Sequence, residues 1–404
     1  MHRPINRLII LFFISFVCPF IIGDFFGNKP FENLFFAIII FVVIQLVLEL
    51  LFQISFFLAN GKRYIKKKDL SFNDLYIEPH PYLPFVYKKE FNGPKTQKFN
   101  YPLNPNSILP QLKSNNFRFF NGVNGDRDIL IPKPKRLIRI NCMGSSTTGN
   151  YISVNNKTYS YPIQLEEQLK TNFNNVEVNN CAMGGYNSVD MLVRFSLSVI
   201  DTEPDFLLLM PGYTDVKSYF TPSYDSDYSH SRKGLGEIYW KLLIRSKIPN
   251  FQLQYINYIT SEWIPEFSMR NNVLDAISKG GFDDKINPEI GLQKYKRNIQ
   301  SIIDISKSRD IDTVLCTYCM YMYDEIKEKK VHKLYNEIVT KENMVLKDLA
   351  KKNNLLLIDV ANLMPKKSSN FVDSIHYSHK GMKTLANIIS ENLIKSFKNK
   401  FINE

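Results

Sequence analysis

Residues 137–149 read LIRINCMGSSTTG, an apolar segment that runs directly into glycines and hydroxyl-bearing side chains. Its first part, Leu137–Cys142, has the aliphatic composition and the short length of a buried strand, and Gly144 interrupts that pattern. Similar segments recur further along the chain, at Val176–Asn180, Phe206–Met210, Thr313–Thr317 and Leu355–Val360. We therefore expect a sheet of five strands.

Amphipathic helical segments alternate with these strands. They are predicted at Tyr161–Asn172, Ser188–Val199, Leu292–Lys307, Val331–Lys351 and His379–Phe397. Pro162 behind Ser160 is a typical helix start, because proline is tolerated in the first turn and serine caps it. Strand–helix alternation predicts a parallel sheet with helices on both faces, which is a three-layer α/β/α sandwich.

Polar loops follow the predicted strands, and in open parallel sheets functional sites lie beyond the carboxyl ends of the strands. The first three strands are followed by GSSTTG at 144–149, CAMGGYNS at 181–188 and PGYTD at 211–215. A fourth loop, DSIH at 373–376, precedes the last helix. Together these loops predict a site at one edge of the sheet.

The four loops contain the groups that acyl transfer needs. A serine nucleophile requires a base, and a neutral imidazole is the usual one near pH 7. Asp373 lies three residues before His376, close enough to fold back and hold its tautomer. We predict Ser146, Asp373 and His376 as catalytic residues. The oxyanion hole is predicted from the amides of Ser146 and Gly185 and the hydroxyl of Thr214.

The first of these loops resembles the nucleophile block of the SGNH/GDSL hydrolase superfamily, and the resemblance extends over about residues 136–398. Members of that superfamily place the nucleophile in a Gly-Asp-Ser-x-Thr-like block directly after the first strand. Gly144–Thr148 fits this block. The register favours Ser146 over its neighbour Ser145 as the nucleophile.

The remaining loops correspond to the other blocks of the superfamily. The oxyanion-donating glycine of the second block corresponds to Gly185, and the last block, Asp-x-x-His, is met in full by Asp373 and His376. The third block, Gly-x-Asn-Asp, matches residues 212–215 except that Thr214 takes the place of the asparagine. A threonine has one donor on a shorter side chain, so this departure puts the oxyanion hole in question.

The resemblance implies a flavodoxin-like SGNH sandwich with a five-stranded parallel sheet, preceded by N-terminal transmembrane helices. It also implies a serine esterase that hydrolyses an acyl ester, an acetyl ester among the candidates, on an envelope carbohydrate or lipid, through a Ser146-acyl intermediate. No cofactor or metal is expected. Two alternatives stay open: an O-acyltransferase that uses the same triad, and a catalytically silent, glycan-binding envelope-assembly protein, which Thr214 favours.

Two apolar runs open the chain, at Leu8–Ile22 and Leu34–Leu58. The second is long enough to cross a bilayer, whereas the first is short and could instead be a cleaved signal peptide. We expect residues 1–60 to form a membrane anchor of one or two transmembrane helices. Basic residues flank both runs, and the positive-inside rule then places the catalytic domain in the cytoplasm.

The rest of the chain divides by composition. Residues 61–135 are rich in proline and aromatic residues and predict an extended connector that packs on the catalytic domain, residues 136–404. Within that domain, residues 216–291 are far longer than an ordinary connection, and predict either a substrate lid or a structural subdomain.

Charge and cysteine content narrow the function classes. The net charge is +12, yet the basic residues form no patch interleaved with aromatics, so we expect no nucleic-acid partner. Five cysteines is an odd number, which argues against a disulfide framework. Cys316 and Cys319 are predicted to be buried thiols. The expected partners are an acylated small molecule or glycan and the membrane.

Overall fold

The computed structural model describes residues 77–78, 80, 82–92, 97–101, 103–109, 111–120, 127–154, 157–220, 226–228, 288–327 and 329–403, and positions 39–40, 43–44, 46–48, 50–51 and 54. The chain divides into two compact units: residues 1–71 with 233–270, and residues 72–232 with 271–404. The first of the two predicted apolar runs lies outside the described residues, as does most of the insertion at 216–291.

In the first unit, the described positions between 39 and 54 are helical, and apolar side chains such as Leu46 and Leu50 are exposed. Among the residues that the structure describes, no helix combines the length and the apolar character needed to span a membrane. The anchor and the orientation of the catalytic domain stay predictions.

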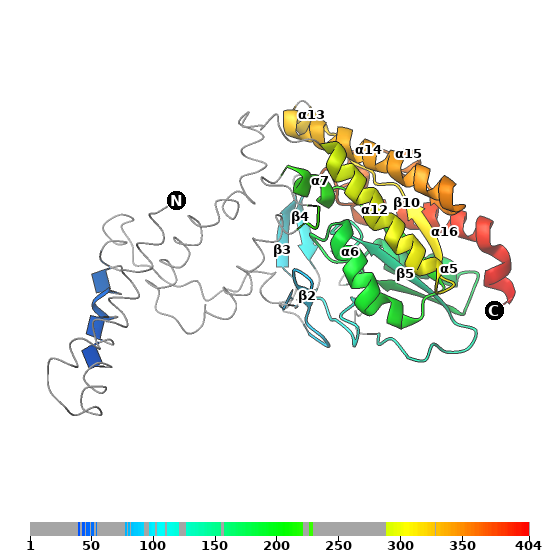
Figure 1. Ribbon diagram of the computed structural model, residues 1–404, viewed down its shortest axis with the longest axis horizontal. Coiled ribbons are helices and arrows are strands. Elements are labelled where there is room, and N and C mark those ends of the chain that lie inside the picture. Colours follow the sequence, from blue (N-terminus) through cyan, green and yellow to red (C-terminus); the bar gives the residue numbers. More distant parts are fainter. Residues whose placement is uncertain are drawn as a thin grey trace. The chain divides into compact units, whose positions relative to one another are not determined.

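The second unit is built around a sheet of five parallel strands, in agreement with the sequence pattern (Figure 1). The strands are β5 (Ile138–Gly144), β8 (Val176–Asn180), β9 (Phe206–Met210), β10 (Asp312–Cys316) and β11 (Leu356–Ile358). Their spatial order is β11-β10-β9-β5-β8. Chain order reverses at β5, which lies between β8 and β9, so the sheet has its topological switch point beside this strand.

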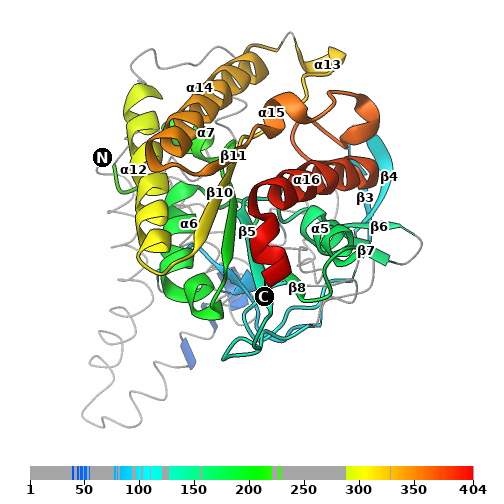
Figure 2. The same ribbon diagram turned by 90° about the vertical axis from the view of Figure 1, so that its right-hand side faces the viewer.

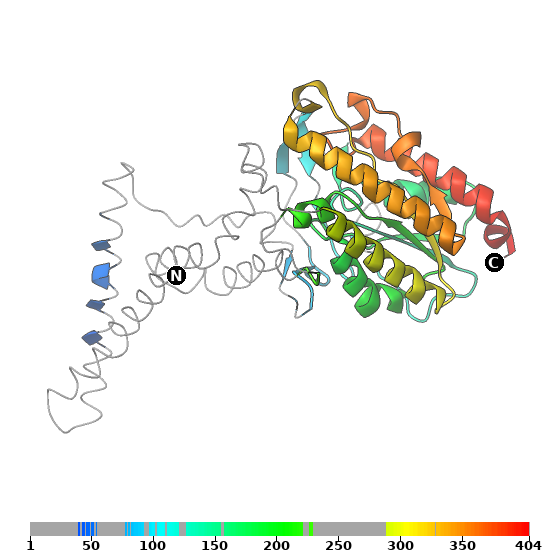
Figure 3. The same cartoon turned by 45° about the horizontal axis from the view of Figure 1, so that its top comes forward.

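Helices cover both faces of the sheet, as expected (Figure 2). On one face α5 (Tyr161–Lys170) and α16 (His379–Asn403) pack against each other. On the other face lie α6 (Ser188–Arg194), α7 (Thr214–Tyr219), α12 (Pro288–Lys307) and α14 (Lys330–Asn353), and Figure 3 shows α12 and α14 running alongside one another.

Local signals fix where the helices begin. The Ser160 hydroxyl caps α5 by accepting from the amide of Ile163, as predicted from Pro162. Asn187 caps α6 and forms a reciprocal pair with Asp190, so this helix starts directly after the second polar loop.

Most predicted bounds differ from the structure by one to six residues, and two predicted elements also end in a different conformation. The predicted helix Ser188–Val199 is α-helical only to Arg194 and continues as a π-helical turn over Phe195–Val199. The predicted last strand is too long, because Val360 already begins the short helix α15 (Val360–Leu363). Asp359 turns the chain there, and its carboxylate accepts from the hydroxyl of Thr317 at 2.8 Å.

The segment before β5, which we call the lead-in segment (residues 77–135), forms hairpins within the same unit as the sheet. Strand β1 (Ile77–Glu78) pairs antiparallel with β2 (Val86–Tyr87), and β3 (Gln97–Tyr101) pairs antiparallel with β4 (Asn104–Leu109). The sequence predicted an extended conformation here but not these strand pairs.

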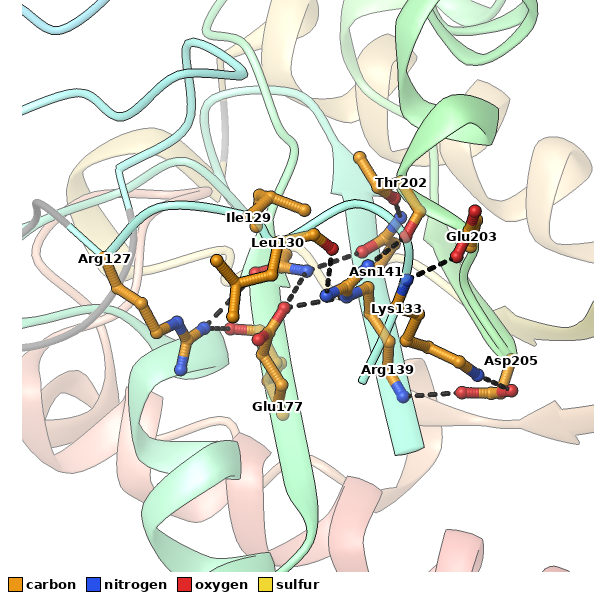
Figure 4. A network of polar contacts seen from close by, with 12 residues as sticks. Arg127, Ile129, Leu130, Lys133, Arg139, Asn141, Glu177, Thr202, Glu203 and Asp205 are labelled. Carbon is orange, nitrogen blue, oxygen red and sulfur yellow. Dashed lines mark hydrogen bonds and ion pairs between the residues drawn. The ribbon is translucent and has the colours of Figure 1, made fainter. Parts of the chain in front are cut away.

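A buried polar network joins the end of the lead-in segment to the sheet (Figure 4). Arg139 of β5 is fully buried, and its Nε donates to Glu177 Oε1 of β8 at 2.8 Å. The same guanidinium donates to the carbonyls of Leu130 and Thr202. One buried cation therefore satisfies a carboxylate and two carbonyls from different parts of the chain.

Further ion pairs extend the network at its rim. Lys133 pairs with Asp205, whose other oxygen accepts from the Arg139 amide at 2.7 Å. Arg127 donates to both carboxylate oxygens of Glu166 at 2.7 Å and to the carbonyl of Val178 at 2.9 Å. These bonds hold residues 127–133 against α5, β8, the start of β5 and the residue that precedes β9.

Replacing Arg139 tests how much of the stability depends on this network. We expect Arg139→Met to lower the free energy of unfolding by about 3–5 kcal/mol, because Glu177 is then left as a buried charge without its cation. Urea denaturation of the full-length protein measures it. Lys341→Met is the control, since the Lys341–Glu289 pair is exposed and its loss is worth less than about 1 kcal/mol. Equal costs in the two variants would contradict this role for Arg139.

Candidate active site

Ser146 lies in the tight turn that ends β5. A side chain at Gly144 would collide with Thr148 and would come within 2.8 Å of the Met210 carbonyl, so the strand can turn here only at a glycine. The amides of Thr148 and Gly149 both donate to the Ser145 carbonyl, at 3.1 and 3.0 Å. The turn leaves Ser146 partly exposed, whereas its neighbour Ser145 is buried.

The Ser146 hydroxyl faces an imidazole that a carboxylate holds in place. Ser146 Oγ lies 3.0 Å from His376 Nε2, and His376 Nδ1 lies 2.7 Å from Asp373 Oδ2. The second oxygen of Asp373 accepts from the amides of Ile375 and His376, at 2.8 and 2.7 Å. With Nδ1 donating to Asp373, the Nε2 lone pair is directed at the Ser146 hydroxyl and can accept its proton.

The charge of Asp373 is maintained by the same contacts. Burial acts to raise the pKa of this carboxyl, but the hydrogen bond and charge of His376 and the two amide donors outweigh it and hold the pKa below its ordinary value. Asp373 is therefore ionised at neutral pH, which is the state that orients an imidazole and stabilises its protonated form.

Two residues that we did not predict hold the serine loop against the histidine loop. Thr147 Oγ1 donates to the Ile375 carbonyl at 3.3 Å and shares a hydrogen bond with the Tyr318 hydroxyl. Asn150 Nδ2 donates to the Tyr377 carbonyl at 3.0 Å. The only sequence signal for these two residues was their position close to Ser146, one and four residues after it. Their bonds explain why loops far apart in the sequence keep a fixed separation.

The second polar loop flanks the serine. A Cβ atom on Gly184 would lie 3.7 Å from Ser146 Cβ, and the amide of Met183 donates to the Gly144 carbonyl at 3.3 Å. Gly185 is exposed and has a φ of +84°, a conformation that other residues rarely adopt. The loop is thus adjacent to Ser146, and the assignment of the Gly185 amide as an oxyanion donor stays a prediction.

The third loop approaches the serine turn through Thr214. Its hydroxyl donates to Ser145 Oγ at 2.6 Å. The proton of Thr214 is therefore engaged by the serine beside Ser146 in this structure. A role for Thr214 in the oxyanion hole requires that this hydroxyl rotate away from Ser145, and that role stays a prediction.

Asp215, directly after Thr214, anchors the third loop to α6. Its carboxylate accepts from the amide and hydroxyl of Ser188, at 2.7 and 2.5 Å, and from the Tyr228 hydroxyl at 3.0 Å. Burial raises its pKa to about 7, although these hydrogen bonds act to lower it. Burial and the nearby charge of Asp215 likewise raise the pKa of Glu342. The structure thus favours the neutral forms of two buried carboxyls.

Partly exposed tyrosines border the loop that contains Asp373 and His376. The pKa of Tyr213 and that of Tyr323 are raised first by burial and then by the charge of Asp373. The Tyr321 amide donates to the Ser374 carbonyl at 2.9 Å. The Tyr321 ring stacks on Phe371 with centroids 5.0 Å apart, and the Tyr213 ring packs against Tyr335 at 5.5 Å.

The cysteines near the site do not compete as nucleophiles. Cys142, Cys181, Cys316 and Cys319 are free and buried, as predicted for the last two. Burial raises the pKa of Cys319 to about 11, so its thiol is not ionised at neutral pH.

His379, one helical turn beyond His376, packs its ring against Tyr159, with centroids 4.3 Å apart.

Comparison with known proteins gives one family. The model of the GDSL-like lipase/acylhydrolase family matches residues 142–384. A search of curated protein sequences finds no match.

Solved structures give distant similarities. A GDSL-like lipase from Bacteroides thetaiotaomicron is 14% identical, with 66% of this chain and 93% of that chain covered and a TM-score of 0.38. The lipase/acylhydrolase from Enterococcus faecalis is 15% identical, with 64% and 97% covered and a TM-score of 0.40. Axe2, an acetylxylan esterase from Geobacillus stearothermophilus, is 14% identical, with 64% and 96% covered and a TM-score of 0.38.

The raised pKa of Asp215 predicts a pH-dependent stability. Because the folded state favours the neutral acid, its contribution is complete below pH 4 and is lost as the pH rises through about 7. The free energy of unfolding of the wild type should therefore fall between about pH 4 and 7 by up to about 1.4 kcal/mol per pH unit more than that of Asp215→Asn, and the two curves should run parallel above about pH 7. Urea denaturation at several pH values measures this.

The exposed carboxyl of Asp304 on α12 supplies the control. Asp304→Asn should leave the pH dependence of the wild type unchanged. Parallel stability curves for the wild type and Asp215→Asn would show that Asp215 is not titrating in this range.

Proposed function

We propose that this chain, which belongs to the GDSL-like lipase/acylhydrolase family, hydrolyses an acyl ester through a covalent intermediate on Ser146. Ester hydrolysis is the activity of this family, and the proposal concerns which residues of this chain carry it out and on which substrate. The observation that carries it is the pair of short contacts from Ser146 Oγ to His376 Nε2 and from His376 Nδ1 to Asp373, at 3.0 and 2.7 Å.

The mechanism follows from those contacts. His376 Nε2 takes the proton of the Ser146 hydroxyl as Oγ bonds to the ester carbonyl carbon, and the carbonyl oxygen becomes an oxyanion. The amides of Ser146 and Gly185 are the proposed donors to it. When the tetrahedral intermediate collapses, the ester C–O bond breaks and His376 gives its proton to the departing alcohol. Asp373 stabilises the imidazolium throughout.

Hydrolysis of the acyl-enzyme repeats these steps with water. His376 removes a proton from the water as its oxygen bonds to the acyl carbon, and Ser146 leaves as the alcohol after taking that proton back. The products are a carboxylic acid and the original enzyme, so no cofactor or redox partner enters the balance.

We propose an acylated carbohydrate as the substrate class, with an acetyl ester as the simplest case. The support is the group of partly exposed tyrosines, Tyr213, Tyr321 and Tyr323, beside the loop of Asp373. Flat rings with polar tips suit a ligand that has both apolar faces and hydroxyls, as a sugar does.

Replacing each of the two adjacent serines by alanine in a separate variant tests which of them is the nucleophile. Ser146→Ala should lower kcat/KM for p-nitrophenyl acetate by about 10⁴-fold or more, because the covalent route is lost. Ser145→Ala removes the same atom from the neighbouring buried serine and should stay within about 10-fold of the wild type. If Ser146→Ala stays active and Ser145→Ala is inactive, Ser145 is the nucleophile instead. If both variants stay active, the reaction does not proceed through a covalent intermediate on either serine.

A catalytically silent, glycan-binding protein is the second candidate, and the hydrogen bond from Thr214 to Ser145 favours it. If the Thr214 hydroxyl donates to Ser145, it is not available as the third donor to the oxyanion, and the transition state is then stabilised less. The loss of one oxyanion donor lowers the rate by about 10²–10³-fold. The two functions predict different responses to a better donor at position 214.

Thr214→Asn supplies that donor. For an esterase limited by its oxyanion hole, we expect kcat for p-nitrophenyl acetate to rise by about 10-fold or more, since the carboxamide reaches further than a hydroxyl. Thr214→Val, which keeps the shape and removes the hydroxyl, is the control and should not raise kcat. No turnover in any of the three proteins, wild type included, would favour the silent protein.

A further inference from the structure

The loop that follows β10, residues 317–323, bonds to both halves of the proposed site. Its Tyr318 hydroxyl shares a hydrogen bond with Thr147, the residue directly after the proposed nucleophile. Further along the same loop, the amide of Tyr321 donates to the carbonyl of Ser374 at 2.9 Å, within the histidine loop. One loop from the fourth strand of the chain therefore contacts the serine turn and the histidine loop together.

The direction of the bond between Tyr318 and Thr147 follows from counting protons. The Thr147 hydroxyl has a single proton, and it donates this proton to the Ile375 carbonyl at 3.3 Å. Tyr318 is therefore the donor in the other bond. Burial raises the pKa of the Tyr318 hydroxyl well above its ordinary value, so the hydroxyl keeps the proton that it donates. The three groups form a chain in which Tyr318 orients the Thr147 hydroxyl toward Ile375.

Tyr318 is itself held in place by groups outside the serine turn. Asn343 of α14 accepts from the Tyr318 amide at 2.7 Å and donates to the Tyr318 carbonyl at 2.9 Å. The preceding residue, Thr317, donates to Asp359 at 2.8 Å and accepts from the amide of Ala361 at 2.9 Å. The start of the loop is thus fixed to α14 and to the turn after β11, and both backbone groups of Tyr318 are satisfied.

The bond that Tyr318 orients spans the same gap as the proton transfer. Thr147 follows Ser146 directly, and Ile375 directly precedes His376. The bond between Thr147 and Ile375 therefore lies one residue away, on each side, from the 3.0 Å contact between Ser146 Oγ and His376 Nε2. A misplacement of about 1 Å in such a contact can cost about 10²-fold in rate.

We propose that Tyr318 is a positioning residue for the catalytic site, which sets the separation of Ser146 and His376 through the Thr147 hydroxyl and the Ile375 carbonyl. Tyr318 acts through Thr147 and takes no part in the bond changes of the reaction. The inference rests on the proposed function of Ser146 and His376.

Kinetics of full-length variants on p-nitrophenyl acetate test the proposal. Tyr318→Phe removes only the hydroxyl that donates to Thr147. Tyr151→Phe is the matched control, because its hydroxyl is also buried and donates to the Phe120 carbonyl of the lead-in segment, at 3.2 Å. We expect Tyr318→Phe to lower kcat by about 10-fold with KM within about 2-fold, and Tyr151→Phe to keep kcat within about 2-fold. Melting temperatures should fall by similar amounts in the two variants, which separates positioning from stability.

Variants of Thr147 test whether Tyr318 acts through this residue. Thr147→Val keeps the shape, removes the hydroxyl and should lower kcat at least as much as Tyr318→Phe. Thr147→Ser retains the hydroxyl and should restore most of the activity that Thr147→Val loses. In the double variant, Tyr318→Phe should add less than about 2-fold to the loss in Thr147→Val, because the hydroxyl that it orients is already absent.

Three results would overturn the inference. They are an unchanged kcat in Tyr318→Phe, an equal loss of kcat in Tyr318→Phe and Tyr151→Phe, and losses that multiply in the double variant with Thr147→Val. If Tyr318→Phe does not fold, a kcat in Thr147→Val equal to that of the wild type overturns it as well. Ser146→Ala is measured in the same series. Should Ser146→Ala keep the wild-type rate, the proposed function fails; should it be inactive while Tyr318→Phe is unaffected, only the positioning role fails.

Discussion

The hydrogen bond between the Ser146 hydroxyl and His376 Nε2 joins loops that are 230 residues apart in the chain. It exists because β5 ends in the sheet at the switch point and because Thr147 and Asn150 bond to the loop that contains His376. The turn that contains Ser146 is thus held by hydrogen bonds from Thr147 and Asn150 to backbone carbonyls of the histidine loop. A small change in either loop would lengthen the one separation on which proton transfer depends.

The amino-terminal ends of the same strands serve a different purpose. There the buried guanidinium of Arg139 donates hydrogen bonds to Glu177 and to two carbonyls. The ion pairs of Lys133 and Arg127 attach the lead-in segment to the residues beside these strands. Buried charges contribute little net stability, but removing one partner is costly, so such a network fixes one arrangement of the chain. The lead-in segment is in this way fastened to the sheet, and its Phe85 carbonyl also accepts from the Tyr186 hydroxyl of the second polar loop.

Much of this architecture could be predicted from the sequence. The bounds of β8 and β9 were predicted correctly, because each strand is a short segment with every residue buried between clear turn signals. The meeting of Ser146, Asp373 and His376 also followed from the placement of polar loops at strand ends, which the parallel topology brings to one edge.

The contacts of the lead-in segment could not be predicted in the same way. The bonds of Arg118, Arg127 and Phe85 join residues that are 31 to 101 positions apart, and no periodicity in the sequence marks them. The bond from Thr214 to Ser145 was also unforeseen, because the sequence identifies a missing asparagine and not the direction in which the replacing hydroxyl points.

The most direct test of the account is to trap the nucleophile. A fluorophosphonate reacts only with a serine that an adjacent base activates, so intact-mass and peptide mass spectrometry report both the reaction and its position. The account predicts one stoichiometric adduct on Ser146 that is lost in His376→Ala. An adduct on Ser145, or labelling of Ser146 that does not require His376, would contradict it.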